Sequence, residues 1–143
     1  MQVDLVGIFK AASGSLQRIQ GLNQEVWQAI QSAGGKQWRK GDQKVGGWRL
    51  LVGIGTYSRS DLELAERLLK LPASPDRVIE FFDVLEIKDM QEFEDYIPGI
   101  GKVWGTPVVG FWRDGKLNGA SHGYGAGLLL HSLFPNDLPA SPK

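Results

Sequence analysis

The amino-acid sequence predicts an α/β domain in which a mixed sheet carries flanking helices and ends in a hairpin followed by a helix. Two nearly continuous apolar runs, residues 49–54 and 77–84, have the pattern of strands buried on both faces. Helix-period segments separate these runs and close the chain. Asp114-Gly115 lies between two strand-like segments and is a strong signal for a two-residue hairpin. A parallel pair followed by an antiparallel hairpin makes the sheet mixed.

The composition is that of one globular domain, residues 1–143, without thiol chemistry. Hydrophobic residues make up 42% of the chain, and the formal net charge of zero gives the whole molecule no electrostatic attraction to nucleic acid. The chain has no cysteine, which excludes disulfides, thiolate metal sites and dithiol exchange within it. No apolar run is long enough to span a membrane, and the N-terminus lacks a signal-peptide pattern. We therefore expect a cytoplasmic protein with no membrane partner.

Charge is distributed unevenly along the chain. Residues 1–49 hold seven basic and three acidic side chains, a net +4, whereas residues 50–100 hold five basic and eleven acidic ones, a net −6. Such asymmetry either matches solvated faces of one molecule or marks a partner surface. The basic stretch 36–49 also contains two tryptophans, a mixture that can stack on nucleic acid. Because this patch is short, we do not expect nucleic-acid binding to be the principal function.

The first 47 residues are predicted to hold a helix and a basic connection. Residues 15–33 place apolar side chains at spacings of three and four, which is the period of an amphipathic helix. Ser13 or Ser15 can cap the start of this helix, and Gly34-Gly35 end it. Residues 3–9 fit either a short strand or a first helical turn. The glycine-rich stretch that follows the helix is read as a connection without regular structure.

The first predicted strand leads into a polar turn, residues 57–60, and then into a helix that ends before Pro72. Two serine–acid pairs have capping-box spacing at the start of that helix: Ser58 with Asp61 and Ser60 with Glu63. The second strand is followed by a short acidic helix. The remaining predicted elements are that helix (89–97), a strand (106–112), its antiparallel return (116–121), a closing helix (126–134) and a flexible, proline-rich tail (135–143).

Residues 103–133, VWGTPVVGFWRDGKLNGASHGYGAGLLLHSL, combine a Thr-Pro step that opens a strand, a tight return turn, a glycine segment and a final helix. This combination resembles the thioredoxin-like fold family, and the likeness covers residues 48–134. The resemblance implies that the peptide bond before Pro107 is cis, a form found almost solely before proline. It also implies that this loop faces the turn after the central strand.

The turn itself departs from the family's pattern. In the family an aromatic residue precedes a Cys-x-x-Cys motif, whereas here Tyr57 precedes Ser58-Arg59-Ser60-Asp61. The resemblance places Ser58 at the position of the nucleophilic cysteine and Asp61 at that of the resolving one. Serine is not ionised near neutral pH, and the sequence offers no adjacent base to activate it. We therefore expect a redox-inactive site with no catalytic residue and no cofactor, and no dithiol oxidoreductase activity.

Binding is the function that this resemblance favours. In the family the turn, the proline loop and the glycine segment line a groove, and the backbone before the proline can pair with an extended peptide. We expect a protein-binding, scaffold or regulatory module whose partner is another protein or an extended peptide, with a second copy of this chain as an alternative. Aromatic residues would supply anchors, and Arg59 a preference for acidic partners. The candidate binding residues are Tyr57, Ser58, Arg59, Ser60, Asp61, Trp104, Thr106, Pro107, Gly123 and Tyr124.

Two other functions stay open. Related folds hold a thiol's sulfur with Tyr or Ser at this helix N-terminus, so Tyr57 and Ser58 would suit a glutathione-binding enzyme, although the helical second domain of glutathione transferases is missing. Gly53-Ile54-Gly55, with Asp83 at the end of the next strand, resembles the start of a dinucleotide fingerprint, but Ser58 stands at its third glycine position.

Histidine is the remaining residue type that could hold a metal. His122 and His131 are nine residues apart, and glycines separate them from any common helix face. No carboxylate has metal-site spacing to either of them. We therefore expect no metal site.

Overall fold

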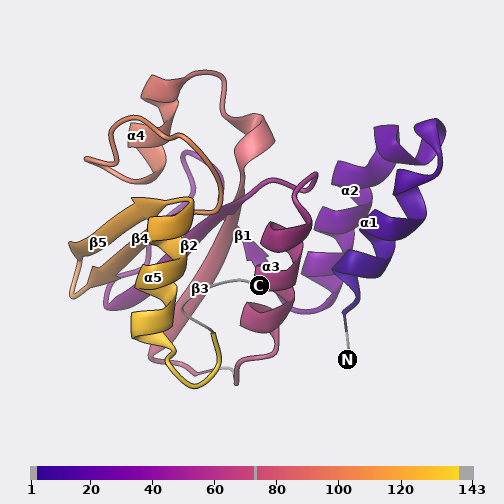
Figure 1. Cartoon of the computed structure of the whole chain (residues 1–143). Coiled ribbons are helices and arrows are strands. Elements are labelled where there is room, and N and C mark those ends of the chain that lie inside the picture. The colour runs from indigo at the N-terminus through magenta and orange to yellow at the C-terminus, as the bar shows by residue number, and fades with distance from the viewer. Residues whose placement is uncertain (1–2, 73, 139–143) are drawn as a thin grey trace.

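The computed structural model describes residues 3–72 and 74–138, which fold around one mixed β-sheet (Figure 1). The strands are β1 (Lys36–Gln37), β2 (Trp48–Ile54), β3 (Arg77–Asp83), β4 (Val108–Arg113) and β5 (Lys116–His122). They lie in the order β1-β3-β2-β4-β5. β1, β3 and β2 pair in parallel, whereas β4 is antiparallel to both β2 and β5. The predicted mixed α/β sheet is confirmed.

Helices cover this sheet. Within the described residues they are α1 (Leu5–Ser13), α2 (Leu16–Ser32), α3 (Arg59–Leu69), α4 (Phe93–Tyr96) and α5 (Tyr124–Leu133), with two 3-10 turns, η1 (Val84–Glu86) and η2 (Met90–Glu92), ahead of α4. In Figure 1, α3 and α5 lie over the same face of the sheet. The indigo pair α1 and α2 packs on the side of α3 that is turned away from α5. One face is therefore covered by a continuous layer of four helices.

The first segment of the chain is helical, which is one of the two alternatives that the sequence left open. Asp4 caps α1 by accepting a hydrogen bond from the Gly7 N–H at 2.9 Å. Glu66 of α3 accepts the Leu5 N–H at 2.7 Å, so a carboxylate from another helix satisfies a free donor of the first turn. Ser15 caps α2 in the same way, by accepting from Arg18. The Glu66 contact therefore joins the start of α1 to α3.

The basic connection contains an element that the sequence did not predict. Lys36–Gln37 form β1, which pairs in parallel with Glu80 and Phe81 of β3. The N–H of Trp38 adds a further hydrogen bond to the Phe81 carbonyl at 2.7 Å. Two residues are too few to show a hydrophobic periodicity. This strand is stabilised by its pairing with β3 and by the buried ring of Trp38.

The main core lies between the sheet and the four-helix layer. Alternate residues of a strand point to opposite faces, and Leu50, Val52 and Ile54 of β2 point to the helices. From the helices, the fully buried side chains that meet them are Leu5, Leu22, Val26, Ile30, Leu62, Ala65, Ala126 and Leu130. α1 and α2 are therefore part of the same core as the sheet, and not an appendage to it.

The opposite face of the sheet has a smaller core with a buried ion pair. Arg49 Nε lies 2.7 Å from Glu80 Oε1, and both side chains are almost fully buried. The guanidinium lies between two indole rings, 5.1 Å from the centre of Trp38 and 4.7 Å from that of Trp112. Lys36 Nζ approaches the second Glu80 oxygen at 3.4 Å. β1, β2, β3 and β4 all contribute to this cluster, which joins the four strands.

The C-terminal third contains the tight turn that the sequence predicts. Asp114 and Gly115 have φ angles of 52° and 79°, in the left-handed region that Asp tolerates and Gly favours, and they connect β4 to β5. The peptide bond between Thr106 and Pro107 is cis. Of the segment expected to be a flexible tail, residues 135–138 form a turn in which Leu138 is buried, and residues 139–143 lie outside the described residues.

Candidate functional site

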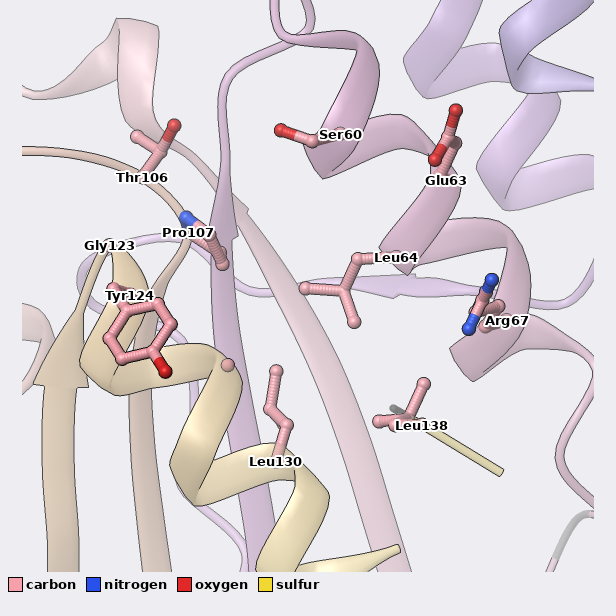
Figure 2. A pocket seen from close by; sticks show the side chains of 11 residues that line it. Ser60, Glu63, Leu64, Arg67, Thr106, Pro107, Gly123, Tyr124, Leu130 and Leu138 are labelled. Atoms are coloured by element: carbon pink, nitrogen blue, oxygen red, sulfur yellow. The ribbon is translucent and has the colours of Figure 1, made fainter. Parts of the chain in front are cut away.

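A cavity of about 350 Å³ opens between α3, the loop that holds the cis peptide bond, and the start of α5 (Figure 2). Five of the sequence-predicted binding residues line it: Ser60, Thr106, Pro107, Gly123 and Tyr124. Its volume lies at the small end of the range of about 300–1,000 Å³ for ligand pockets. The cavity can therefore hold a compact group, such as one or two side chains of a bound peptide.

The first turn of α3 presents one hydroxyl group, that of Ser60, to this cavity. Ser58 is the N-cap, and its Oγ accepts the Asp61 N–H at 3.3 Å. Ser58 Oγ also lies 3.1 Å from Ser60 Oγ, and Ser60 lines the cavity. The capping pair is therefore Ser58 with the backbone of Asp61, the first of the two spacings that the sequence offered.

Asp61 is a fully buried carboxyl group beneath the cavity wall. Its Oδ2 accepts the Gly55 N–H at 2.9 Å, whereas Oδ1 has no hydrogen-bond partner among the described residues. Burial raises the pKa of Asp61 above its ordinary value, while the Gly55 hydrogen bond and the nearby hydroxyls of Thr106 and Ser58 oppose that rise. The carboxyl thus joins the end of β2, the start of α3 and the proline loop.

Five of the predicted site residues do not line the cavity: Tyr57, Ser58, Arg59, Asp61 and Trp104. The Tyr57 hydroxyl donates to the Ile19 carbonyl of α2 at 3.4 Å, which turns this ring toward the N-terminal helices. Arg59 Nε pairs with Glu63 of its own helix at 3.1 Å. The Tyr57 hydroxyl is thus bound to α2, and the Ser58 hydroxyl caps α3. The geometry therefore gives no support to a sulfur-binding role for them.

Two large aromatic side chains near the proline loop are exposed: Tyr124, which lines the cavity, and Trp104, which precedes Thr106 by two residues. Trp104 is 77% exposed and Tyr124 is 66% exposed, although both are large aromatic side chains. Their two loops touch, since the Trp104 N–H donates to His122 Nδ1 at 3.3 Å. His122 therefore acts as a structural acceptor between the loops. We call the surface formed by Ser60, Trp104, Thr106, Pro107, Gly123 and Tyr124 the docking surface.

The Gly-Ile-Gly stretch at the end of β2 has packing and hydrogen-bonding roles. A Cβ at Gly53 would overlap the ring of Phe82, so only glycine fits under that ring. The Gly55 N–H, which a dinucleotide phosphate would need, is already bound to the Asp61 carboxylate. A negative group at that point also opposes a phosphate. These contacts do not favour a dinucleotide site.

The residues after Gly55 are fixed by a polar chain that reaches α2. Thr56 Oγ1 donates to Asn23 Oδ1 at 2.6 Å, and Asn23 Nδ2 donates to Asp83 Oδ2 at 2.9 Å. Thr56 and Asp83 are both buried. Asp83, which the sequence offered as a ribose-binding acid, thus holds together the ends of β2 and β3 and the N-terminal helices.

The other wall of the cavity was not predicted from the sequence. It consists of Glu63, Leu64, Arg67, Gly127, Leu130 and Leu138. Three of these continue the helix face that begins at Ser60, because residues three, four and seven positions along a helix lie on one side of it. This helical spacing could have been used to place these three residues on the same face of the helix as Ser60. Leu138 gave no local signal, since its place depends on His131 Nδ1, which lies 2.6 Å from the Leu138 carbonyl oxygen.

Within the described residues, neither a metal-binding cluster nor a membrane-spanning helix accompanies the cavity. No group of three or more His, Asp or Glu residues within 3–72 and 74–138 is arranged to hold a metal ion. None of the helices described has both the length and the hydropathy that crossing a bilayer requires. No protein-family model, no curated protein and no solved structure matches the chain.

Proposed function

We propose that this chain is a redox-inactive, thioredoxin-like module that binds an extended segment of another protein at the docking surface. The order of elements along the chain from β2 supports a thioredoxin-like assignment: β2, α3, β3, β4, β5 and α5. The sheet order β3-β2-β4-β5 supports it as well. The cis bond before Pro107 and its position opposite the start of α3 support it too. With no cysteine in the chain, such a site can bind but cannot exchange disulfides.

The exposure of Trp104 and Tyr124 carries this proposal. Large aromatic side chains are usually buried, and where they remain exposed beside a cavity they are typical anchors of protein interfaces. Tyr124 lines a cavity that also presents apolar side chains and the hydroxyl groups of Ser60 and Thr106, and Trp104 precedes Thr106 by two residues on the same loop. An interface of this kind, apolar at its centre and polar at its rim, fits a peptide that buries one side chain.

The backbone of the proline loop offers the hydrogen bonds that a peptide needs. Among the described residues, neither the N–H nor the carbonyl of Thr106 takes part in a hydrogen bond, although the neighbouring Pro107 carbonyl accepts from Gly123 at 2.9 Å. An extended segment can pair with these free groups by strand addition. Main-chain pairing would supply affinity, and the cavity would select the side chain.

Selection of peptides on the purified protein tests this function. Peptides enriched from a random linear library on the wild type are expected to bind at least about tenfold more weakly to the double variant Trp104→Ala/Tyr124→Ala, because aromatic anchors of this kind contribute about 2 kcal/mol or more. Affinity is measured by calorimetry, after circular dichroism shows that the variant is folded.

A matched control separates this surface from exposed apolar residues in general. Leu16 and Leu85 are 77% and 52% exposed and lie on other elements, α2 and η1. The variant Leu16→Ala/Leu85→Ala is expected to bind the selected peptides as the wild type does. Equal binding by the aromatic double variant, or a library from which nothing is enriched, would contradict the proposal.

A further inference from the structure

The cavity contains one cationic side chain, and within the described part of the chain it has no carboxylate partner. Arg67 lines the cavity, yet it appears in none of the ion pairs formed there. The one acid in the lining, Glu63, is already paired with Arg59. The charge available to a ligand at this wall is therefore positive.

Apolar side chains form much of the cavity wall near Arg67. Leu64 and Arg67 project from α3, and Leu130 and Leu138 face them from the other side (Figure 2). Leu130 and Leu138 are buried, so this part of the wall belongs to the core of the protein. An apolar floor with a free guanidinium at one end suits a group that pairs an apolar side chain with a carboxylate.

The position of Arg67 along α3 sets the spacing of such a group. Ser60, in the first turn, lies at the same end of the cavity as Thr106, whereas Arg67 lies two turns further on (Figure 2). Seven residues of helix span about 10 Å. An extended peptide covers that length with about three residues. A segment paired with the Thr106 backbone would thus bring a residue about three positions away to Arg67.

We propose that the docking surface recognises an acidic segment, in which an apolar side chain enters the cavity and an Asp or Glu about three residues from the Thr106-paired position binds Arg67. This inference rests on the proposed function and adds the partner's chemistry to it. It also moves the acid preference that the sequence assigned to Arg59 to a different arginine, since Arg59 is paired within its own helix.

Parallel peptide selections test the assignment. On the wild type, enriched peptides are expected to share an apolar residue and an acid at a fixed spacing. The variant Arg67→Gln is expected to lose the enrichment of the acid but to keep the apolar residue. The charge reversal Arg67→Glu is expected to replace the acid with Lys or Arg, which is a gain that a misfolded protein cannot produce.

The charge requirement can be measured with single peptides. For one enriched peptide, Asp→Asn or Glu→Gln is expected to weaken binding about two- to fivefold, as for a partly exposed ion pair. The loss should shrink as salt is added, because salt screens such a pair. On Arg67→Gln, the acidic peptide and its amide should bind equally.

Lys70→Gln is the matched control. This substitution also removes one positive charge, at the C-cap of α3, but Lys70 does not line the cavity. The inference would be overturned if peptides selected on Arg67→Gln still shared the acidic residue, or if Lys70→Gln abolished its enrichment to the same extent. Either result would leave the proposed function at the docking surface unaffected. Enriched peptides that ignore Trp104→Ala/Tyr124→Ala, or no enriched peptides at all, would overturn the proposed function and the inference with it.

Discussion

Asp61 shows how a single buried residue next to the cavity can cost stability. Its carboxyl is fully buried, and one oxygen has no hydrogen-bond partner among the described residues. A buried polar atom left without a partner typically costs about 1–3 kcal/mol. Glycine and serine hydrogen bonds at the other oxygen and the backbone offset part of this cost. We expect a site residue of this kind to be one where stability can be gained by substitution.

The variant Asp61→Asn tests this residue through the pH dependence of stability. Since burial raises the pKa of Asp61 in the folded protein, the wild type is expected to lose stability as pH rises from the unfolded-state pKa, near 3.8, through the folded-state value. The amide does not titrate. The unfolding free energy of the variant minus that of the wild type should therefore increase between pH 4 and pH 8, as measured by urea denaturation. A decrease in this difference would show that the folded protein stabilises the carboxylate.

At the scale of residues, features that depend on near neighbours in the sequence could be predicted, whereas features that depend on distant residues could not. The Ser58 cap and the Asp114-Gly115 turn could be predicted because each depends on neighbours within three positions. The helical period places Arg67 on the same face of α3 as Ser60. Leu138 could not be placed at the cavity, because its position depends on how the chain turns after α5. Tyr57 was predicted as an anchor but turns to α2, a contact 38 residues away in sequence.

At the scale of strands, the ion pair of Arg49 and Glu80 joins the neighbouring parallel strands β2 and β3, in which Arg49 lies opposite Val78 and Glu80 opposite Leu51. The variant Glu80→Gln is expected to lower the unfolding free energy by about 3–5 kcal/mol, since it leaves a buried guanidinium without its counter-charge. Replacing both, as Arg49→Met/Glu80→Leu, should cost much less, because no unpaired charge remains. Chemical denaturation of the three proteins measures both values. A double variant that is less stable than Glu80→Gln would mean that the ion pair itself makes a large net contribution to stability.

Element-level prediction succeeded where apolar periodicity was long and failed where an element was short. β2, β3, α2 and α3 agree with their predicted ranges within a few residues, as buried runs and amphipathic faces allow. β1 has two residues and forms only because Glu80 and Phe81 offer it a parallel partner. The acidic segment 89–97 was predicted as one helix, but it divides into η2 and the four-residue α4.

At the scale of the whole molecule, the N-terminal helices and the sheet form one folding unit. Leu5, Leu22, Val26 and Ile30 belong to the main core, and Asn23 links α2 to the ends of two strands. A protein reduced to residues 48–143 is therefore expected to lack cooperative thermal unfolding, because it would expose the apolar side of α3. Circular dichroism melting measures this. A sharp transition in the truncated protein would instead show that residues 48–143 fold without the N-terminal helices.

The exposure of Trp104 has a practical consequence in optical spectroscopy. The chain has five tryptophans; Trp27 and Trp38 are buried, and Trp48 and Trp112 are half-buried among aromatic and cationic neighbours. Trp104 alone is largely open to water and to added quenchers. The emission of this one indole reports on contact at the surface around it, so the protein carries an intrinsic fluorophore where a dye would otherwise have to be attached.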